Sequence, residues 1–390
     1  MLLCFPLMTL AQQTVGLFSN QPSSYNGYTL FNSLGSTNTN MNNFHANNNP
    51  NLFCVDVDDV AWSTNNWTNI SAQTYFSTNC QAPPTTYVPD NNFEAYLENN
   101  GMGNGIPYDS SVFTSAIDTL TYLDVSMGAG SATGIFDLTG IEDFTALTYL
   151  DCSYNQFTIF DVSQNTALTT LYCHSNQLTT LDVSQNTVLT KLDCGDAQLT
   201  SIDVSQNTAL TTLYCYSNQL TTLDVSQNTV LTKLDCGDAQ LTSIDLSQNT
   251  ALIDLWCGLN LLTNLDVSQN IALTFLSCNQ NLFTILDVSQ NTALTYLDCW
   301  QNELTSLDLR NGNNTALDIY TQNNPNLFCI DVDNPVWSTA NWTVANGTID
   351  PQHYFSNNCS SVPFDCTDSL EVTDVIIDNG ALTMNIAIYN

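Results

Sequence analysis

The stretch LTTLYCYSNQLTTLDVSQNT, residues 210–229, decides the fold, because the chain from Leu147 to Leu309 consists of about eight copies of it. The copies recur every 21 residues, and residues 167–208 and 209–250 are the same string except at two positions. A period of this length indicates short units that cannot bury a core alone and that stack into one continuous core.

Each copy has two halves with the same spacing. The first half reads L-x-x-L-x-C-x-x-N-x-L and the second reads L-x-x-L-x-V-x-x-N. Because this motif recurs in register, the chain resembles the leucine-rich repeat family over roughly residues 120–330. The resemblance implies a repeat solenoid with a parallel β-sheet on its concave face and a convex side of extended segments and turns. It also implies little helix, and recognition of a ligand through the concave sheet.

Eight cysteines occupy one position of the first half, where the second half has Val or Leu. In a strand this position shares a face with the leucine two residues earlier, so we expect the thiols to face the core as small hydrophobes. Parallel Cβ directions disfavour disulfides between neighbouring coils, and the surrounding leucines disfavour a metal site. The predicted core ladder is Cys152, Cys173, Cys194, Cys215, Cys236, Cys257, Cys278 and Cys299.

Asparagines form two further rows, one in each half of the unit. Buried amides in such rows bond backbone groups where each coil bends. Ala197 and Ala239 interrupt the first row, so we expect those two coils to be less well fixed. The first row is Asn155, Asn176, Asn218, Asn260, Asn281 and Asn302; the second is Asn165, Asn186, Asn207, Asn228, Asn249, Asn270 and Asn291.

A different module occurs twice, as NNPNLFC…STNC within residues 48–81 and as NNPNLFC…SNNC within residues 311–360. The second copy follows the array directly and resembles a C-terminal cap that closes an open hydrophobic end. In an exported protein we expect two disulfides, Cys54–Cys80 and Cys329–Cys359; the alternative is further buried thiols.

The remaining segments complete the expected organisation. Residues 1–11 read as a secretory signal peptide without the usual basic start, and residues 12–47 as a polar segment. Residues 82–119 are a linker with a short helix between Asp90 and Gly101. They lead into the array at 120–310, in a manner that resembles secreted, internalin-like bacterial proteins. Residues 361–390 read as a hairpin that begins a truncated β domain.

Three basic residues against 37 acidic ones give the 390-residue chain a formal net charge of −34. Phosphate binding needs Lys and Arg, so nucleic acid is not an expected partner. No later run approaches the length of a membrane-spanning helix, so we expect no membrane insertion after signal removal. A monomer, secreted or held at the cell surface, is expected.

The outward positions of the first half vary and are rich in aromatic residues. Exposed aromatics with few basic neighbours suit a protein or glycan ligand, although tyrosine also favours strands for purely structural reasons. The candidate ligand-binding residues of the concave face are Tyr149, Tyr172, His174, Tyr214, Tyr216, Trp256, Phe275, Tyr296 and Trp300.

The second half presents a row of aspartates outward, at the spacing of stacked strands. Bound Ca²⁺ would relieve their repulsion, but Ca²⁺ needs six or more oxygen ligands, so a solvated acidic stripe is the alternative. No other metal or cofactor is expected. The weak calcium candidates are Asp182, Asp203, Asp224, Asp245, Asp266 and Asp287, and the row also includes Asp161 and Asp308.

No catalytic signature accompanies these patterns. The histidines at 45, 174 and 353 have no Cys or carboxylate partner at motif spacing, and no phosphate loop or nucleophile elbow occurs. We therefore expect a non-enzymatic binding protein of the adhesin or adaptor type, with a protein ligand. Two alternatives are a carbohydrate-binding accessory protein and a structural or adaptor repeat module of a larger surface protein.

Overall fold

The computed structural model describes residues 23–25, 28–31, 44–46, 52–71, 74–78, 80, 83–126, 134–359, 370–378 and 381–388. The predicted signal peptide lies outside these residues, as does most of the polar segment. The chain divides into two compact units, Met1–Leu231 and Thr232–Asn390, each of which is described by itself. Within the described residues, every helix is too short or too polar to cross a bilayer.

The first unit begins with the first copy of the cap module. Cys54 and Cys80 form a disulfide with their Cα atoms 5.7 Å apart. The buried ring of Trp67 packs against Phe44 and Phe76, with ring centroids 4.8 and 5.6 Å away. The elements are β1 (Ser23–Tyr25), β2 (Tyr28–Phe31), β3 (His45–Ala46), β4 (Leu52–Asp56), α2 (Val60–Asn66), β5 (Asn69–Ile70) and β6 (Tyr75–Ser77). Strand β4 lies parallel to both β2 and β6.

The segment that leads into the array contains the predicted helix. Asp90 caps it by accepting the N–H groups of Asn92 and Phe93, and its other carboxylate oxygen accepts the N–H of Phe136 at 2.8 Å. Asp90 therefore fastens the helix to the start of the array. Gly101, with φ +74°, follows the helix end. The elements are β7 (Thr85–Tyr87), α3 (Asn91–Asn99), β8 (Ser111–Phe113), α4 (Thr114–Ile117) and η3 (Ile141–Asp143).

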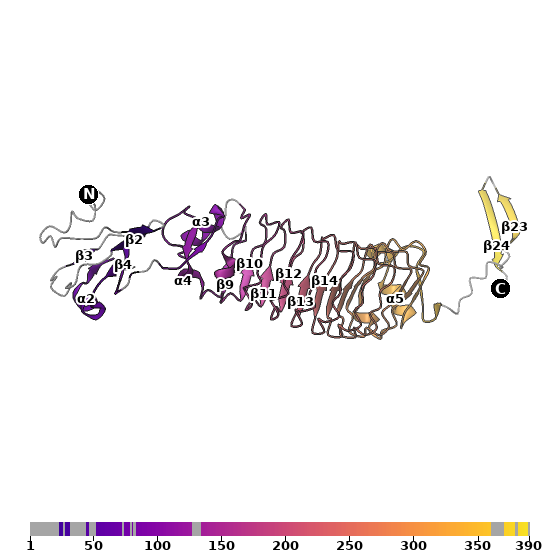
Figure 1. Ribbon diagram of the computed structural model, residues 1–390. Coiled ribbons are helices and arrows are strands. Elements are labelled where there is room, and N and C mark those ends of the chain that lie inside the picture. Colours follow the sequence, from indigo (N-terminus) through magenta and orange to yellow (C-terminus); the bar gives the residue numbers. More distant parts are fainter. Residues whose placement is uncertain are drawn as a thin grey trace. The chain divides into compact units, whose positions relative to one another are not determined.

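Five parallel strands of the array belong to the first unit, and they lie side by side in register (Figure 1). Each strand has three residues, because only the tripeptide around the central leucine is extended before the chain bends. The central leucine is buried in every strand, as is the residue two positions later, which is Val125 for β9 and a cysteine for the other four strands. The strands are β9 (Tyr122–Asp124), β10 (Tyr149–Asp151), β11 (Thr170–Tyr172), β12 (Lys191–Asp193) and β13 (Thr212–Tyr214).

The second unit continues the same pattern with five more parallel strands and adds a second sheet on the other half of the coils. The first set is β14 (Lys233–Asp235), β15 (Asp254–Trp256), β16 (Phe275–Ser277), β18 (Tyr296–Asp298) and β20 (Asp318–Tyr320). The second set is β17 (Ile285–Asp287), β19 (Ser306–Asp308), β21 (Cys329–Asp331) and β22 (Tyr354–Ser356). Before Ile285, the second half of each described coil consists of turns and extended chain, so the architecture is the predicted leucine-rich repeat solenoid.

The second cap module extends both sheets, so the repeat pattern runs past its predicted end at residue 310. Strand β18 pairs with β20, and β19 pairs with β21. Cys329 and Cys359 form the second disulfide. The other elements are η4 (Asn314–Ala316), α5 (Pro335–Asn341), η5 (Val344–Asn346) and the antiparallel pair β23 (Leu370–Asp378) and β24 (Ala381–Ile388). Residues 379 and 380, between these two strands, lie outside the described residues.

The first asparagine row holds each coil to the coil before it. Asn218 Nδ2 donates to the carbonyls of Cys194 and Cys215, both at 3.0 Å, and its Oδ1 accepts the N–H of Leu199 at 2.9 Å. Ala197 occupies the position of Asn218 one coil earlier in the chain. Its methyl side chain offers no hydrogen-bond acceptor to the neighbouring coil. The Cys194 carbonyl is still reached by Asn218, so the interruption in this unit is partly bridged by the next coil.

Candidate binding face

The central leucine of each three-residue strand points into the core, so the residues on either side of it point outward. We call these outward side chains, together with the outward residue two positions after each strand, the sheet face. In the first unit the sheet face is formed by β9–β13, and in the second by β14, β15, β16, β18 and β20.

In the first unit, three tyrosines from successive strands lie ring against ring on the sheet face. The ring centroids of Tyr122 and Tyr149 are 4.5 Å apart and nearly parallel, and those of Tyr149 and Tyr172 are 5.7 Å apart. Burial, followed by the nearby charge of Asp151, raises the pKa of Tyr149 to about 12. His174 makes an edge-on contact with Tyr154, at 4.8 Å between ring centroids.

Two more predicted residues, Tyr214 and Tyr216, lie farther along the same face. The Nζ atom of Lys191 is 4.7 Å from the ring centroid of Tyr172 and 5.6 Å from that of Tyr214, so one ammonium group contacts two rings. The ring of Tyr216 lies across Gly195, where a Cβ atom would come within 2.4 Å of it. Glycine at 195 is thus required for this placement of the ring.

In the second unit, the remaining predicted aromatics form another cluster. The ring centroids of Trp256 and Phe275 are 4.6 Å apart, and Phe275 stacks on Tyr296 at 4.5 Å with an interplanar angle of 2°. Tyr296 continues to Tyr320, at 5.6 Å. Trp300 lines an open hollow of about 360 Å³ together with Tyr296, Tyr320, Asp298 and Gln322. The aromatic side chains therefore gather in clusters within each unit rather than in unbroken columns.

Carboxylates interrupt these rings on the sheet face. Asp193 and Asp298 each accept the N–H of the residue two positions on, Gly195 and Trp300 respectively. Burial raises the pKa of both carboxyls above the ordinary aspartate value. Asp193 is buried and Asp298 half-buried, and carboxylates in such positions beside aromatic rings favour ligands that return a positive charge or a hydrogen-bond donor.

The second-half aspartates have a local structural role. Each accepts the N–H of the residue two positions later, which is a serine in all coils except that of Asp308, where it is Arg310. The backbone N–H and hydroxyl of Ser184 hold the pKa of Asp182 below its ordinary value. These contacts stabilise the tight turn that begins each DVSQN segment.

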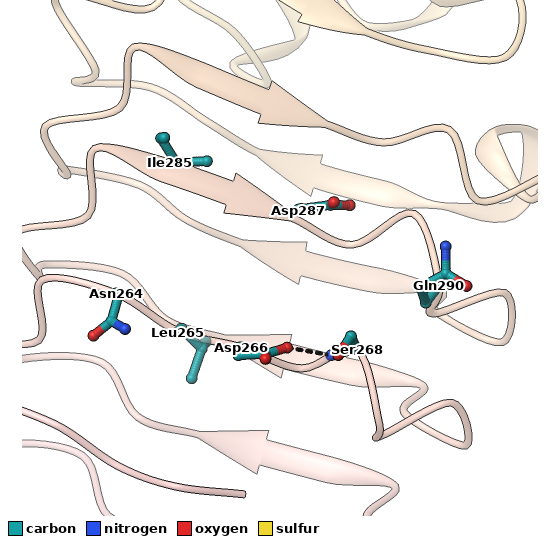
Figure 2. Close-up of a pocket in the computed structure, with 7 residues that line it drawn as sticks. All are labelled: Asn264, Leu265, Asp266, Ser268, Ile285, Asp287 and Gln290. Carbon is teal, nitrogen blue, oxygen red and sulfur yellow. Dashed lines mark hydrogen bonds between the residues drawn. The ribbon is translucent and has the colours of Figure 1, made fainter. Parts of the chain in front are cut away.

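A second hollow, of about 270 Å³, lies along this acidic row in the second unit (Figure 2). Asp266, bonded to the N–H of Ser268, and Asp287 come from successive coils, and Ile285 lies beside them. The residues that line this hollow are Asn264, Leu265, Asp266, Ser268, Ile285, Asp287 and Gln290. Across the described residues, no group of three or more His, Cys, Asp or Glu side chains has the arrangement of a metal site. Calcium binding by the row stays an expectation from the sequence.

The eight ladder cysteines are fully buried free thiols. Burial raises the pKa of Cys257 to about 12, followed by the effect of the Asp235 charge, and raises those of Cys152 and Cys173 well above the ordinary value. Thiols held in this protonated state are poor nucleophiles and poor metal ligands. Their contribution is to packing.

Three members of the sheet face were not among the residues predicted from the sequence. Tyr122 could have been found, because residues 120–124 read LTYLD, the same letters as residues 147–151. Tyr320 was hidden because the repeat lengthens by one residue there, pairing Tyr296 with Asp318. Lys191 is not aromatic, so the search for outward aromatic residues passed over it. Only the structure shows that it lies between two tyrosine rings.

The chain matches no protein-family model and no curated protein. Among solved structures it is similar to the functional domain of InlJ from Listeria monocytogenes, described as including a cysteine ladder. The identity is 34%, covering 65% of this chain and 68% of that chain, with a TM-score of 0.47. It is also similar to a leucine-rich repeat protein of Leptospira interrogans, at 22% identity, 63% and 62% coverage and a TM-score of 0.49. A third similar structure is the internalin InlF from Listeria monocytogenes, at 18% identity, 69% and 91% coverage and a TM-score of 0.40.

Proposed function

The chain belongs to the family of internalin-like leucine-rich repeat proteins, and from this premise we propose that it is a non-enzymatic binding protein that recognises a protein ligand through its sheet face. The observation that carries the proposal is the clustering of aromatic side chains on that face. Rings such as Phe275 and Tyr296 stack on the outward side of their strands and remain only partly buried. Large aromatic side chains supply much of the binding energy at protein interfaces.

The contrast with the other half of the coil supports this assignment. There the outward residues are small or polar in most copies, with Ile159 and Ile285 as exposed exceptions, and the aspartates cap turns. A surface needed only for stacking can repeat with little variation. The greater variation on the sheet face is what a ligand-reading surface would show.

We further propose that the protein acts outside the cell or at its surface. Two disulfides close the cap modules, and such bonds persist in oxidising compartments. The apolar start of the sequence agrees with export. N-terminal sequencing of the exported protein should find Gln12 as the first residue of the mature chain. A mature protein that remains in the cytosol with an intact Met1 would contradict this part of the proposal.

The binding proposal is tested by substitution of Tyr214, Tyr216 and Trp256 with alanine. We expect the variant to lose at least about 90% of the partner captured by the native protein from a cell-surface extract, because these rings are candidate interface anchors. A matched control replaces Gln206, Gln227 and Gln248, exposed on the second half of the coils, with alanine.

Circular dichroism and thermal melting must first show that both variants are folded. Capture of the same partner by the native protein and the glutamine control, but not by the aromatic variant, is the predicted result. Equal capture by all three proteins would refute the assignment of ligand binding to the sheet face. A glycan array run alongside distinguishes the carbohydrate-binding alternative, because oligosaccharide hits without a protein partner would favour it.

A further inference from the structure

The sheet face of the first unit contains a cation held between aromatic rings. Lys191 of β12 places its ammonium over the rings of Tyr172 on β11 and Tyr214 on β13, at 4.7 and 5.6 Å. Asp193 lies two residues along the same strand, and the charge of Lys191 is among the effects that lower its pKa against the opposing effect of burial. Two rings and a buried carboxylate thus form a site that the chain fills with its own lysine.

The second unit has the same chemical components without a lysine among them. The hollow of about 360 Å³ is lined by Tyr296, Trp300 and Tyr320, by the carboxylate of Asp298 and by the amide of Gln322. The Asp298 carboxylate accepts the Trp300 N–H at 3.1 Å and is half-buried. Burial disfavours its charged form, so a cation placed beside it would regain favourable interaction energy.

The chain has no basic side chain to offer this hollow. Lys191, Lys233 and Arg310 are its only lysine and arginine residues. Lys191 lies between Tyr172 and Tyr214, Lys233 pairs with Asp254 at 2.6 Å, and Arg310 pairs with Asp308 on the opposite half of the coil. The cation that the hollow suits must therefore come from another molecule.

We propose that the hollow lined by Tyr296, Asp298 and Trp300 binds a lysine or arginine side chain of a basic protein partner. The net charge of −34 favours such a partner over an acidic one, because a field of one sign concentrates molecules of the opposite charge at the surface. Tyr296 and Tyr320 lie on neighbouring strands, as Tyr172 and Lys191 do, so a side chain approaching the sheet can contact both rings. The proposal rests on the proposed function and specifies the chemistry of its partner.

The test uses the full-length protein labelled with 5-fluorotryptophan and a pentalysine peptide as the probe. The six tryptophans give separate fluorine signals, and a Trp300→Phe variant assigns the one in the hollow. At about 0.15 M salt, where the Debye length is about 8 Å, weak long-range attraction is largely screened. Pentalysine should shift the Trp300 signal and leave that of Trp337, in the cap module, unchanged.

Two matched variants distinguish pentalysine binding at this hollow from general electrostatic attraction to the acidic protein. Asp298→Asn keeps an acceptor for the Trp300 N–H but removes the charge, and it should weaken pentalysine binding by about tenfold. Asp287→Asn removes the same charge on the second half of a coil in the same unit, and it should change binding by less than about twofold. Both variants are expected to remain folded, which thermal melting checks.

A Trp300 signal that does not move, or equal weakening by the two variants, would overturn the proposal. A neutral oligosaccharide such as cellohexaose shifting Trp300 while pentalysine does not would overturn it in favour of a sugar site. The proposed function and the cationic anchor can fail independently of each other. If the aromatic substitutions on the sheet face abolish capture of a protein partner but pentalysine does not bind, recognition stands and only the cationic anchor is wrong.

Discussion

The two halves of each coil share a leucine spacing, yet they use it differently. In the first half, a three-residue strand forms in every coil and the outward residues vary from tyrosine to lysine and aspartate. In the second half of the coils that the structure describes, strands form only from Ile285 onward, and the outward residues repeat mainly as Thr, Asp, Ser and Gln, with Ile159 and Ile285 as exposed exceptions. The inward residues of both halves face the core, although those of the second half are somewhat more exposed: Leu181 is 8% exposed and Leu171 0%, and Ile202 is only partly buried. Stacking therefore constrains both halves, whereas variation on the sheet face requires another cause, which we assign to ligand binding.

The asparagine rows also differ between the halves. Asn218 of the first row uses both its nitrogen and its oxygen, bonding its own coil and the coil before it. Asn186 of the second row donates to the carbonyls of Val162 and Asn165, both at 2.9 Å, but its buried oxygen has no hydrogen-bond partner. The first half therefore gains more from its asparagine, which fixes the bend next to the sheet face.

The largest predicted effect tests this difference between the two asparagine rows. Asn218→Ala should lower the free energy of unfolding by about 3 kcal/mol, since it removes buried hydrogen bonds and leaves the Leu199 N–H without its acceptor. Asn186→Ala should cost only about 1–2 kcal/mol, because one of its two polar atoms has no partner to lose. Guanidinium denaturation followed by circular dichroism measures both.

The natural break in the first row gives a control for this pair. Ala197→Asn restores the missing acceptor and should stabilise the protein by about 1 kcal/mol. Equal losses for Asn218→Ala and Asn186→Ala, with no gain from Ala197→Asn, would show that the two rows are equivalent and that the comparison drawn here is wrong.

A second prediction uses pH, because aspartates on the two halves are shifted in opposite directions. Burial raises the pKa of Asp298, so this group contributes stability below about pH 4, its ordinary pKa, that is lost as pH rises through the raised value. Asp298→Asn should therefore stabilise the protein by about 0.5 kcal/mol at pH 7 after allowance for solvent screening, and this gain should vanish at pH 3.

Asp182 shows the reverse behaviour. The Ser184 N–H and hydroxyl lower its pKa, so its contribution is present above about pH 4 and is lost as pH falls through the lowered value. Asp182→Asn should slightly lower the melting temperature at pH 7 and leave it unchanged at pH 3. Melting curves in which both variants change with pH in the same direction would contradict the assigned causes.

The smallest predicted effect concerns the bend that follows each first-half strand. Leu259 has a left-handed backbone with φ +58°, a conformation that costs leucine more than asparagine. Its side chain is 46% exposed, so little packing is lost on substitution. Leu259→Asn should raise the free energy of unfolding by about 0.5–1 kcal/mol. Unchanged or reduced stability would show that the leucine side chain outweighs the backbone strain.

Much of the interior could be predicted from the sequence, because packing leaves the same mark in every copy. Cys215 could be placed in the core since Val225 occupies the equivalent position ten residues later. The cap disulfides followed from two similar modules, each with a cysteine after NNPNLF and another near its end. The helix after Asp90 carried its own start and stop signals.

The sheet face was harder to predict, because its contacts depend on which outward position of the strand each ring occupies. Tyr149 is the first residue of its strand and Tyr172 the third, so they meet diagonally and form a cluster instead of a column. The left-handed bend is occupied by residues as different as Tyr154 and Leu259, and no residue type marks it. The 21-residue period alone therefore predicts which residues form the core, but not how the side chains of the sheet face are arranged.

The most direct test of the shared core is the reactivity of the eight ladder cysteines. Folded protein is incubated with N-ethylmaleimide, and modified peptides are identified by mass spectrometry, with a guanidinium-unfolded sample as the positive control. Because the thiols line the buried core, all eight should stay unmodified in the folded protein and react fully once it is unfolded. Rapid modification of these thiols while the circular dichroism spectrum remains native would contradict it.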